Sequence, residues 1–226
     1  NIIIETDSRL IKIFERSFNK KIFVESGTFS KNLESLKKFD SVIFAGSLCK
    51  KFRKKINNFK KEKFLITDEI KNNKISQKKF LNNKKLKVGI SWKSSASIYG
   101  RLKSLKLCDF KKLFNDKRQI INLQYGDTKK DIKDIENENI KIYSFEEINL
   151  FADLDSCMSI LQNVDVFVTV SNSTAHIAAA IGIKTILICP KKSSTYFYWN
   201  NEEDHTPWYD NVTILKVSNS IKETIK

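Results

Sequence analysis

Residues 164–190 read VDVFVTVSNSTAHIAAAIGIKTILICP, and this stretch carries the strongest structural signal in the chain. Its first seven residues are rich in β-branched side chains, as in a strand that is buried on both faces. The polar run 171–174 follows, and such side chains cap the free N–H groups where a helix begins. Residues 175–180 are nearly all small and predict a helix packed closely on a sheet, which Gly182 ends before a second buried strand. The stretch therefore predicts a strand–helix–strand unit of a parallel sheet.

The junction between the first of these strands and the helix also predicts an anion site. The N–H groups of a first helical turn are free donors, and the helix dipole favours negative charge beside them. A phosphate or diphosphate is the expected ligand, and His176 lies in the first turn beside it. The polar run is equally consistent with a cap that only starts a helix, and His176 with a structural histidine.

Strands and helices alternate along the rest of the chain. This pattern predicts an α/β fold with a doubly wound parallel sheet on each side of a polar connector at 66–85. The expected strands are 2–5, 21–24, 41–45, 87–92, 119–123, 140–143, 164–170, the run that ends at Pro190, and 212–215. The expected helices are 33–39, 105–114, 129–136, 156–161, 175–180, and one that is capped at residue 7 or 8 and runs to residue 18.

The chain has 226 residues and a formal net charge of +15, which comes from lysines spread over almost every segment. Nucleic-acid surfaces more often combine arginine with interleaved aromatic side chains, so we expect no nucleic-acid partner and interpret the lysines as solvated faces. Attraction of anionic substrates and peripheral association with an anionic membrane stay open. Apolar runs are too short for a membrane span, and two histidines with four widely spaced cysteines predict no metal site.

Three predicted strand ends carry polar residues that suit a diphosphate. They are the run 91–95 with Arg101 and Lys103 behind it, the run 123–126 with Gln124, and the run 171–176. Ligands of open α/β sheets bind outside the carboxyl ends of the strands, and hydroxyls, cations and a helix N-terminus converge there. Taken singly, each has a simpler interpretation: the cations as surface charge, Gln124 as a turn residue, and the aromatic run 196–199 as a packing lid.

Several motifs together resemble one bacterial enzyme family. They are VGISWK at 88–93, RLKSL at 101–105, NLQYG at 122–126, SNSTAH at 171–176 and PWY at 207–209. These motifs are similar to the C-terminal domain of heptosyltransferase-like glycosyltransferases of family 9, particularly members attached to tetratricopeptide repeats. Residues 7–10 and 46–48 are similar to the later portion of the N-terminal domain of the same proteins, so the resemblance covers nearly the whole chain.

The resemblance implies a GT-B architecture of two Rossmann-like parallel-sheet domains. The expected parts are an incomplete N-terminal, acceptor-side domain at 1–70, a linker at 71–85 and a nucleotide-sugar-binding domain at 86–226. The implied reaction is inverting, metal-independent transfer of a sugar from a nucleotide-diphosphate-sugar to a cell-envelope glycan or a protein, with no permanently bound cofactor. Lys103 and Arg101 match positions that stabilise the leaving phosphate. The positions that match the diphosphate site are Ser171, Asn172, Ser173, Thr174 and His176. Those that match the nucleotide pocket are Ser91, Trp92 and Gln124, with Lys93 beside them.

The chain departs from the family pattern in two places. Asn172 stands where many relatives carry Asp. The early N-terminal segment, with its Gly-rich loop and the usual base-bearing region, has no counterpart here. We therefore expect a fragment without an assignable general base, whose activity on its own stays open. The expected location is the cytoplasm, with the inner face of the bacterial inner membrane also open.

Three other functions remain as alternatives. A catalytically inactive GT-B-like module would bind a glycan or a partner without turnover. Electrostatic binding to nucleic acid would weaken steeply with salt and ignore changes at 171–176. A GT-B sugar-nucleotide epimerase would need acid/base carboxylates in the cleft, which the sequence does not identify.

Overall fold

The computed structural model describes residues 1–95, 100–136, 140–190, 198–199 and 204–217. Its strands are β1 (Ile4–Thr6), β2 (Phe23–Glu25), β3 (Leu86–Ser91), β4 (Arg118–Asn122), β5 (Ile142–Tyr143), β6 (Val166–Val170), β7 (Thr185–Pro190) and β8 (Val212–Val217). The α-helices are α1 (Ser8–Phe18), α2 (Leu33–Leu36), α3 (Ala45–Phe52), α4 (Glu69–Ser76), α5 (Gly100–Lys103), α6 (Lys129–Glu136), α7 (Leu154–Gln162) and α8 (Ser173–Ala180). Three 3-10 helices are η1 (Ile56–Asn58), η2 (Lys79–Leu81) and η3 (Leu107–Leu113).

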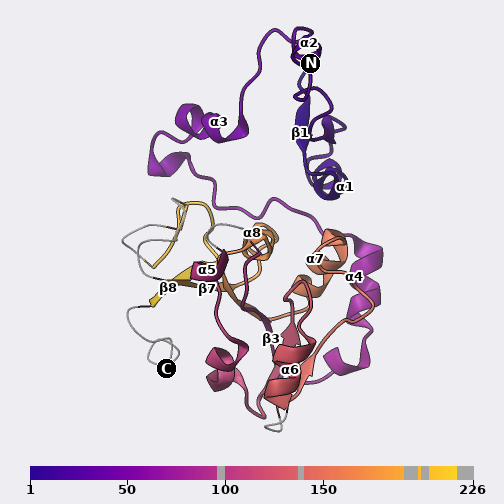
Figure 1. The fold of residues 1–226 in the computed structure, drawn as a ribbon, viewed down its shortest axis with the longest axis vertical. Helices are drawn as coiled ribbons and strands as arrows, with labels where there is room; N and C mark the ends of the chain where they lie inside the picture. Colours follow the sequence, from indigo (N-terminus) through magenta and orange to yellow (C-terminus); the bar gives the residue numbers. More distant parts are fainter. Residues whose placement is uncertain (96–99, 137–139, 191–197, 200–203, 218–226) are drawn as a thin grey trace.

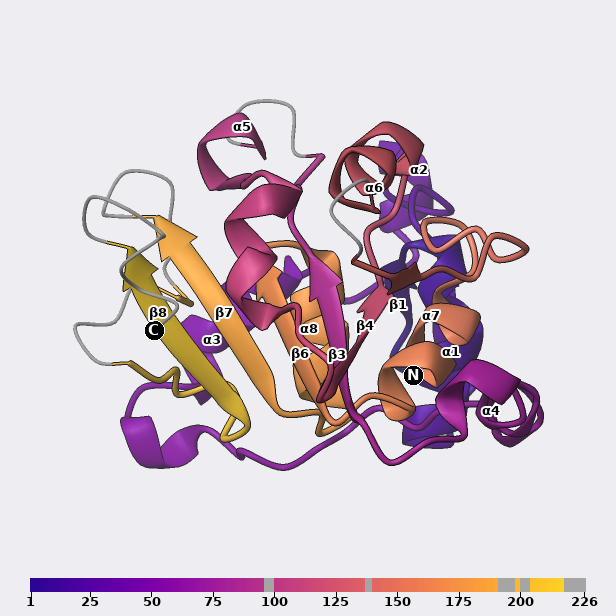
Figure 2. The ribbon, with the colours of Figure 1, turned by 90° about the horizontal axis from the view of Figure 1, so that it is seen from below.

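Six strands form one parallel sheet in the order β5-β4-β3-β6-β7-β8, which confirms the predicted α/β class (Figure 2). From β3 the chain adds β4 and β5 on one side, and then returns to add β6, β7 and β8 on the other. The direction of strand addition therefore switches between β3 and β6. Open α/β sheets bind ligands outside the carboxyl ends of the strands at such a point.

The sheet is covered on both faces, and its side chains alternate between them because neighbouring residues of a strand point to opposite sides. Ile121 and Phe167 pack with residues of α7 and α8. Ile120 and Val168 pack with residues of η3 and α6. All four are at most 4 % exposed, and each fully buried apolar side chain of this kind contributes about 1.5–3 kcal/mol to folding.

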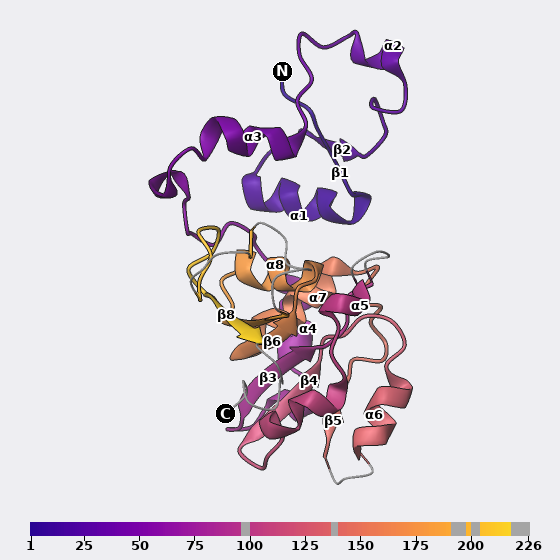
Figure 3. The same cartoon turned by 60° about the vertical axis from the view of Figure 1, so that its left-hand side comes forward.

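A smaller parallel sheet, β1-β2, and its crossover helix α1 lie at one end of the molecule, with the six-stranded sheet at the other end (Figures 1 and 3). Asp7 caps α1 by accepting a hydrogen bond of 3.0 Å from the N–H of Arg9. Ile13 is fully buried in the same core cluster as residues of α7. The side chain of Arg16 pairs with Asp155 of α7. Residue Ile13 and this ion pair therefore connect the small sheet to the large one.

The prediction of a strand at 41–45 is wrong. Ala45 begins α3, and the preceding residues belong to neither sheet. Val42, Ile43 and Phe44 are 56 %, 56 % and 84 % exposed. β-Branched residues favour a strand only where a neighbouring strand and a packed face are present, and neither sheet extends to these residues.

The segment 66–85, which we expected to be a polar connector, contains α4 and η2. Asp68 caps α4 by accepting from the N–H of Lys71 at 2.9 Å, and Ile75 is 4 % exposed. Lys71 of α4 also donates to Asp153 at the start of α7, at 2.6 Å.

The helix expected at 105–114 is the 3-10 helix η3. The domain limits 1–70, 71–85 and 86–226 stay predictions.

Candidate functional site

The ends of β3, β4 and β6 are tied together by a buried network of hydrogen bonds. The side-chain oxygen of Gln124 accepts from the hydroxyl of Ser91 at 2.9 Å and from the N–H groups of Trp92 and Lys93 at 3.0 and 2.7 Å. The side-chain amide of Asn172 donates to the same hydroxyl of Ser91 at 2.9 Å. Because every polar atom named here has a partner, the network holds the switch point rigidly.

Helix α8 starts at this switch point. Asn172 adopts an extended backbone and its side-chain oxygen accepts from the N–H of Ala175 at 3.0 Å, which makes it the N-cap. Ser173 at the first helical position is exposed, whereas Ala175, Ala178 and Ala179 are buried against the sheet. Small side chains let the helix pack closely on the strands. Because α8 directly follows β6, its N-terminus lies at the carboxyl edge of the sheet. This arrangement suits an anion.

A cavity of about 340 Å³ lies in front of this N-terminus. Its walls are the residues that follow β3 and β4, helix α5, the start of α8 and the aromatic segment before β8. The lining residues are Ser94, Ser95, Lys103, Tyr125, Ser171, Asn172, Ser173, His176 and Tyr198. Five of the residues proposed from the sequence meet here: Lys103, Ser171, Asn172, Ser173 and His176. The tertiary structure thus brings α5 and α8 to one site.

The remaining sequence candidates lie around the cavity without lining it. Ser91 and Gln124 are buried in the network described above, and Thr174 is 4 % exposed inside α8. Trp92 is fully buried in the core and its Nε1 donates to Asp131 at 3.0 Å, while the exposed Lys93 pairs with the same carboxylate. Arg101 is exposed on α5. Their proposed contacts with a donor stay predictions.

Three tyrosines belong to the site although the sequence analysis assigned them no role there. Tyr125 and Tyr198 line the cavity. The hydroxyl of Tyr125 accepts from the N–H of Ser95 at 3.1 Å, and that of Tyr209 lies 3.1 Å from Nδ1 of His176. In the sequence, Tyr125 and Tyr209 belong to the motifs NLQYG and PWY, and Tyr198 belongs to the aromatic run 196–199, but no role in the site was inferred for any of the three.

The electrostatics of the cavity combine a buried cation with a neutral histidine. Lys103 is 3 % exposed, and burial lowers its pKa below the usual 10.5. Burial and, second, the nearby charge of Lys103 lower the pKa of His176 to about 4, so the imidazole is neutral at pH 7. Among the residues that the structure describes, no three His, Cys, Asp or Glu side chains gather as a metal site would require. The cavity can therefore bind an anion through Lys103, hydroxyls and helix N–H groups.

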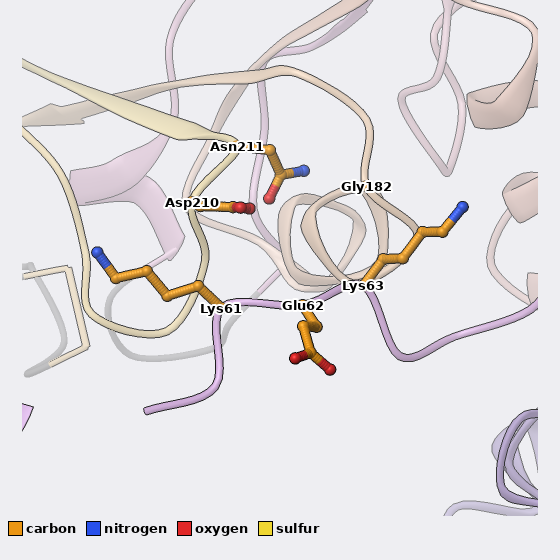
Figure 4. Close-up of a pocket in the computed structure, with 6 residues that line it drawn as sticks. All are labelled: Lys61, Glu62, Lys63, Gly182, Asp210 and Asn211. Carbon is orange, nitrogen blue, oxygen red and sulfur yellow. The ribbon is translucent and has the colours of Figure 1, made fainter. Parts of the chain in front are cut away.

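A second, larger cavity of about 530 Å³ lies at the opposite edge of the sheet, between the segment 61–63 and the residues that precede β7 and β8. Figure 4 shows Lys61 and Lys63 pointing in different directions rather than toward a shared point. Asn211 in its wall donates to the backbone oxygen of Ala179, in the last turn of α8, and to that of Ile183, which follows the helix. Because the two lysines of this cavity diverge and the cavity lies away from the carboxyl ends of the strands, the site at the carboxyl edge remains the candidate.

Comparison with known proteins places the fold. No family model matches the chain. Protein FlbA of Caulobacter vibrioides is 32% identical over 93 residues, which are 41% of this chain and 15% of FlbA. The structure of E. coli ADP-heptose LPS heptosyltransferase II has a TM-score of 0.52 at 12% identity, over 77% of this chain and 53% of that one. A glycosyltransferase of family 9 from Veillonella parvula has a TM-score of 0.47 at 9% identity, over 68% and 42%.

The chain has a fold similar to that of GT-B glycosyltransferases. The six-stranded parallel sheet and the smaller parallel sheet correspond to the two sheets expected from the sequence, so the predicted fold class is confirmed. The chain spans about half the length of the heptosyltransferase and a much smaller share of FlbA. In the described part of the chain, each helix is either too short or too polar to cross a bilayer.

Proposed function

We propose that this chain is the donor-binding part of an inverting glycosyltransferase, which moves a sugar from a nucleotide-diphosphate-sugar to a cell-envelope glycan or a protein without a metal. The observation that carries the proposal is the meeting of buried Lys103 with the N-terminus of α8 in one cavity at the switch point. The similarity of the fold to a heptosyltransferase and the resemblance of the motifs support it.

The proposed roles follow from the charge that develops in such a transfer. An acceptor hydroxyl attacks the anomeric carbon, the bond from that carbon to the diphosphate breaks, and the hydroxyl proton passes to a general base. Negative charge grows on the departing diphosphate, where Lys103 and the N–H groups of α8 would stabilise it. No residue in 1–226 is assigned as the base. The proposed location is the cytoplasm, and attachment to tetratricopeptide repeats is part of the same proposal.

Binding of ADP and UDP to the chain tests this proposal directly. We expect both wild-type protein and Lys106→Met to bind at least one of them in calorimetry, because Lys106 is exposed and does not line the cavity. Lys103→Met keeps an apolar stem of similar length and removes the charge, so its affinity should fall at least about tenfold, which is about 1.4 kcal/mol. A folded wild-type chain that binds neither nucleotide, or a Lys103→Met variant that binds like wild type, contradicts the proposal.

A catalytically inactive, ligand-binding GT-B-like module is the second candidate. The observation that favours it is the absence of any carboxylate among the described residues that line the cavity. Such a module would bind a nucleotide-sugar with the Lys103 dependence described above, but the natural full-length protein would release no nucleoside diphosphate from it. Measured release that depends on an acceptor favours the enzyme.

Peripheral binding to an anionic membrane is supported by α3. Leu48 and Phe52 lie one turn apart on this helix, so they share a face, and they are 37 % and 57 % exposed. Basic residues lie between and after them, at 50, 51 and 53–55. An exposed apolar face bordered by lysines suits the interface of an anionic bilayer. Sedimentation with phosphatidylglycerol vesicles should be lost in Phe52→Ser and kept in Ile70→Ser, which alters an even more exposed apolar side chain on α4. Wild-type protein that stays in the supernatant contradicts the proposal.

A further inference from the structure

His176 is held on three sides by aromatic side chains. Its ring stacks on Trp199, with the ring centres 4.6 Å apart and the planes 23° apart, and meets Tyr198 edge-on at 4.8 Å. Its Nδ1 lies 3.1 Å from the hydroxyl oxygen of Tyr209. Trp199 is 1 % exposed, so the face of the imidazole that stacks on it is covered, while His176 also lines the cavity. The imidazole therefore has a defined orientation, with Nδ1 engaged and Nε2 as its other polar atom.

Both partners of the 3.1 Å contact are uncharged at neutral pH. Burial is the main cause that keeps the imidazole neutral, and burial also raises the pKa of Tyr209 to about 12, so the phenol retains its proton. A neutral imidazole carries one N–H and one lone pair. Two arrangements are then possible: Nδ1–H donates to Tyr209, or the hydroxyl of Tyr209 donates to Nδ1 and the imidazole proton resides on Nε2.

The hydroxyl of Tyr209 favours the second arrangement. Nδ1 of His176 is its hydrogen-bond partner in the described part of the chain. If Nδ1–H were the donor, the phenolic proton would lack an acceptor there, and leaving a half-buried donor unpaired is unfavourable. When the phenol donates, the phenolic proton and Nδ1 are both paired, and only Nε2–H is left for another partner. The reverse arrangement leaves two groups without a partner among the described residues, the phenolic proton and the Nε2 lone pair.

We propose that Tyr209 is a positioning residue that fixes His176 as the Nε2–H tautomer, so that a neutral N–H is available to an anion in the cavity. The nature of that anion rests on the proposed function, whereas the tautomer does not. An Nε2 lone pair would repel a phosphate oxygen, and a charged imidazolium would repel the ammonium of Lys103 nearby. A neutral Nε2–H donor adds a hydrogen bond without either repulsion.

Ring-nitrogen NMR of ¹⁵N-histidine-labelled protein, without ligand, tests the tautomer. Long-range ¹H–¹⁵N correlations distinguish a protonated from an unprotonated ring nitrogen, and exposed His205 provides an internal comparison. We expect His176 in wild-type protein to show protonated Nε2 and unprotonated Nδ1 at pH 7. In Tyr209→Phe, which removes one oxygen atom, we expect a mixture of tautomers. A wild-type Nδ1–H tautomer overturns the proposal, as does a Tyr209→Phe spectrum identical to wild type.

Titration with inorganic pyrophosphate and ADP tests the consequence. We expect Tyr209→Phe to bind ADP three- to tenfold more weakly than wild type, with pyrophosphate weakened by a similar factor because the effect is on the anion. Unchanged affinity for both overturns the proposed effect on the anion. If the expected tautomer is observed but wild-type protein binds neither ligand, the proposed function fails while the tautomer assignment stands.

Discussion

His176 is a residue whose sequence context did not reveal its charge state. Its position in the first turn of α8 follows from the sequence, but its neutral form comes from burial, Lys103 and three aromatic rings that arrive from a segment more than twenty residues away. Gln124 is similar, because its expected place at a strand end is observed, while its use as an acceptor for three donors depends on β3 lying beside β4. Such roles require neighbours that are distant in the sequence.

The low pKa of His176 predicts a loss of stability in acid. In an unfolded chain the histidine has its ordinary pKa of 6.5, whereas the folded protein lowers it to about 4. Between these values the unfolded state binds more protons, so the free energy of unfolding decreases as the pH falls through this window, by about 3 kcal/mol at most. Urea unfolding at pH 7 and pH 4.5 should show wild-type protein losing about 2 kcal/mol more than His176→Gln, which does not titrate.

His205→Gln is the matched control for this measurement, because the side chain of His205 is exposed. It should lose as much stability as wild type between the two pH values. Equal losses in wild type and His176→Gln would mean that His176 is accessible to protons in the folded protein.

At the scale of elements, local patterns identified the strands of the large sheet and most helices. The six-stranded sheet consists of the predicted strands, with ends shifted by one or two residues, because each is a run of β-branched and aliphatic side chains between polar turns. The failed strand at 41–45 has a similar composition. Only Ala45 enters a helix, α3, and residues 41–44 are an exposed segment before it, since a strand also needs a neighbour to accept its backbone hydrogen bonds.

Gly89 in the middle of β3 shows how closely the elements pack. A Cβ atom there would lie 2.6 Å from Cδ1 of Leu123 and 3.2 Å from the ring of Phe167, and both side chains are fully buried. Gly89→Ala should therefore lower the free energy of unfolding by about 1–3 kcal/mol in urea titration. Gly46→Ala in α3 is the control, because nothing lies within 4 Å of its Cβ position, and it should be neutral or stabilising by up to about 1 kcal/mol. Similar effects of both changes would contradict the close packing of β3.

At the scale of the whole molecule, α1 links the small sheet to the large one. Ile13→Ala removes a fully buried side chain from the core shared with α7 and should cost about 2–5 kcal/mol in urea unfolding. Hydrogen exchange should report faster opening of α1. Lys12→Ala, one residue earlier on the exposed face, should leave both measurements within about 0.5 kcal/mol of wild type. An Ile13→Ala variant that behaves like Lys12→Ala would show that α1 is not anchored through this residue.

The sequence by itself determined the parallel α/β class, the strand–helix junction at α8 and the identity of several residues around it. These features depend on short-range patterns of apolar, small and capping side chains, which act over a few residues. Only the tertiary structure decided which of those residues share a cavity. It placed Lys103 of α5 beside His176 of α8, buried Trp92 in the core, and added tyrosines from the aromatic segment. The reason is physical: contacts between distant segments depend on strand order and on helix packing, which no local pattern encodes.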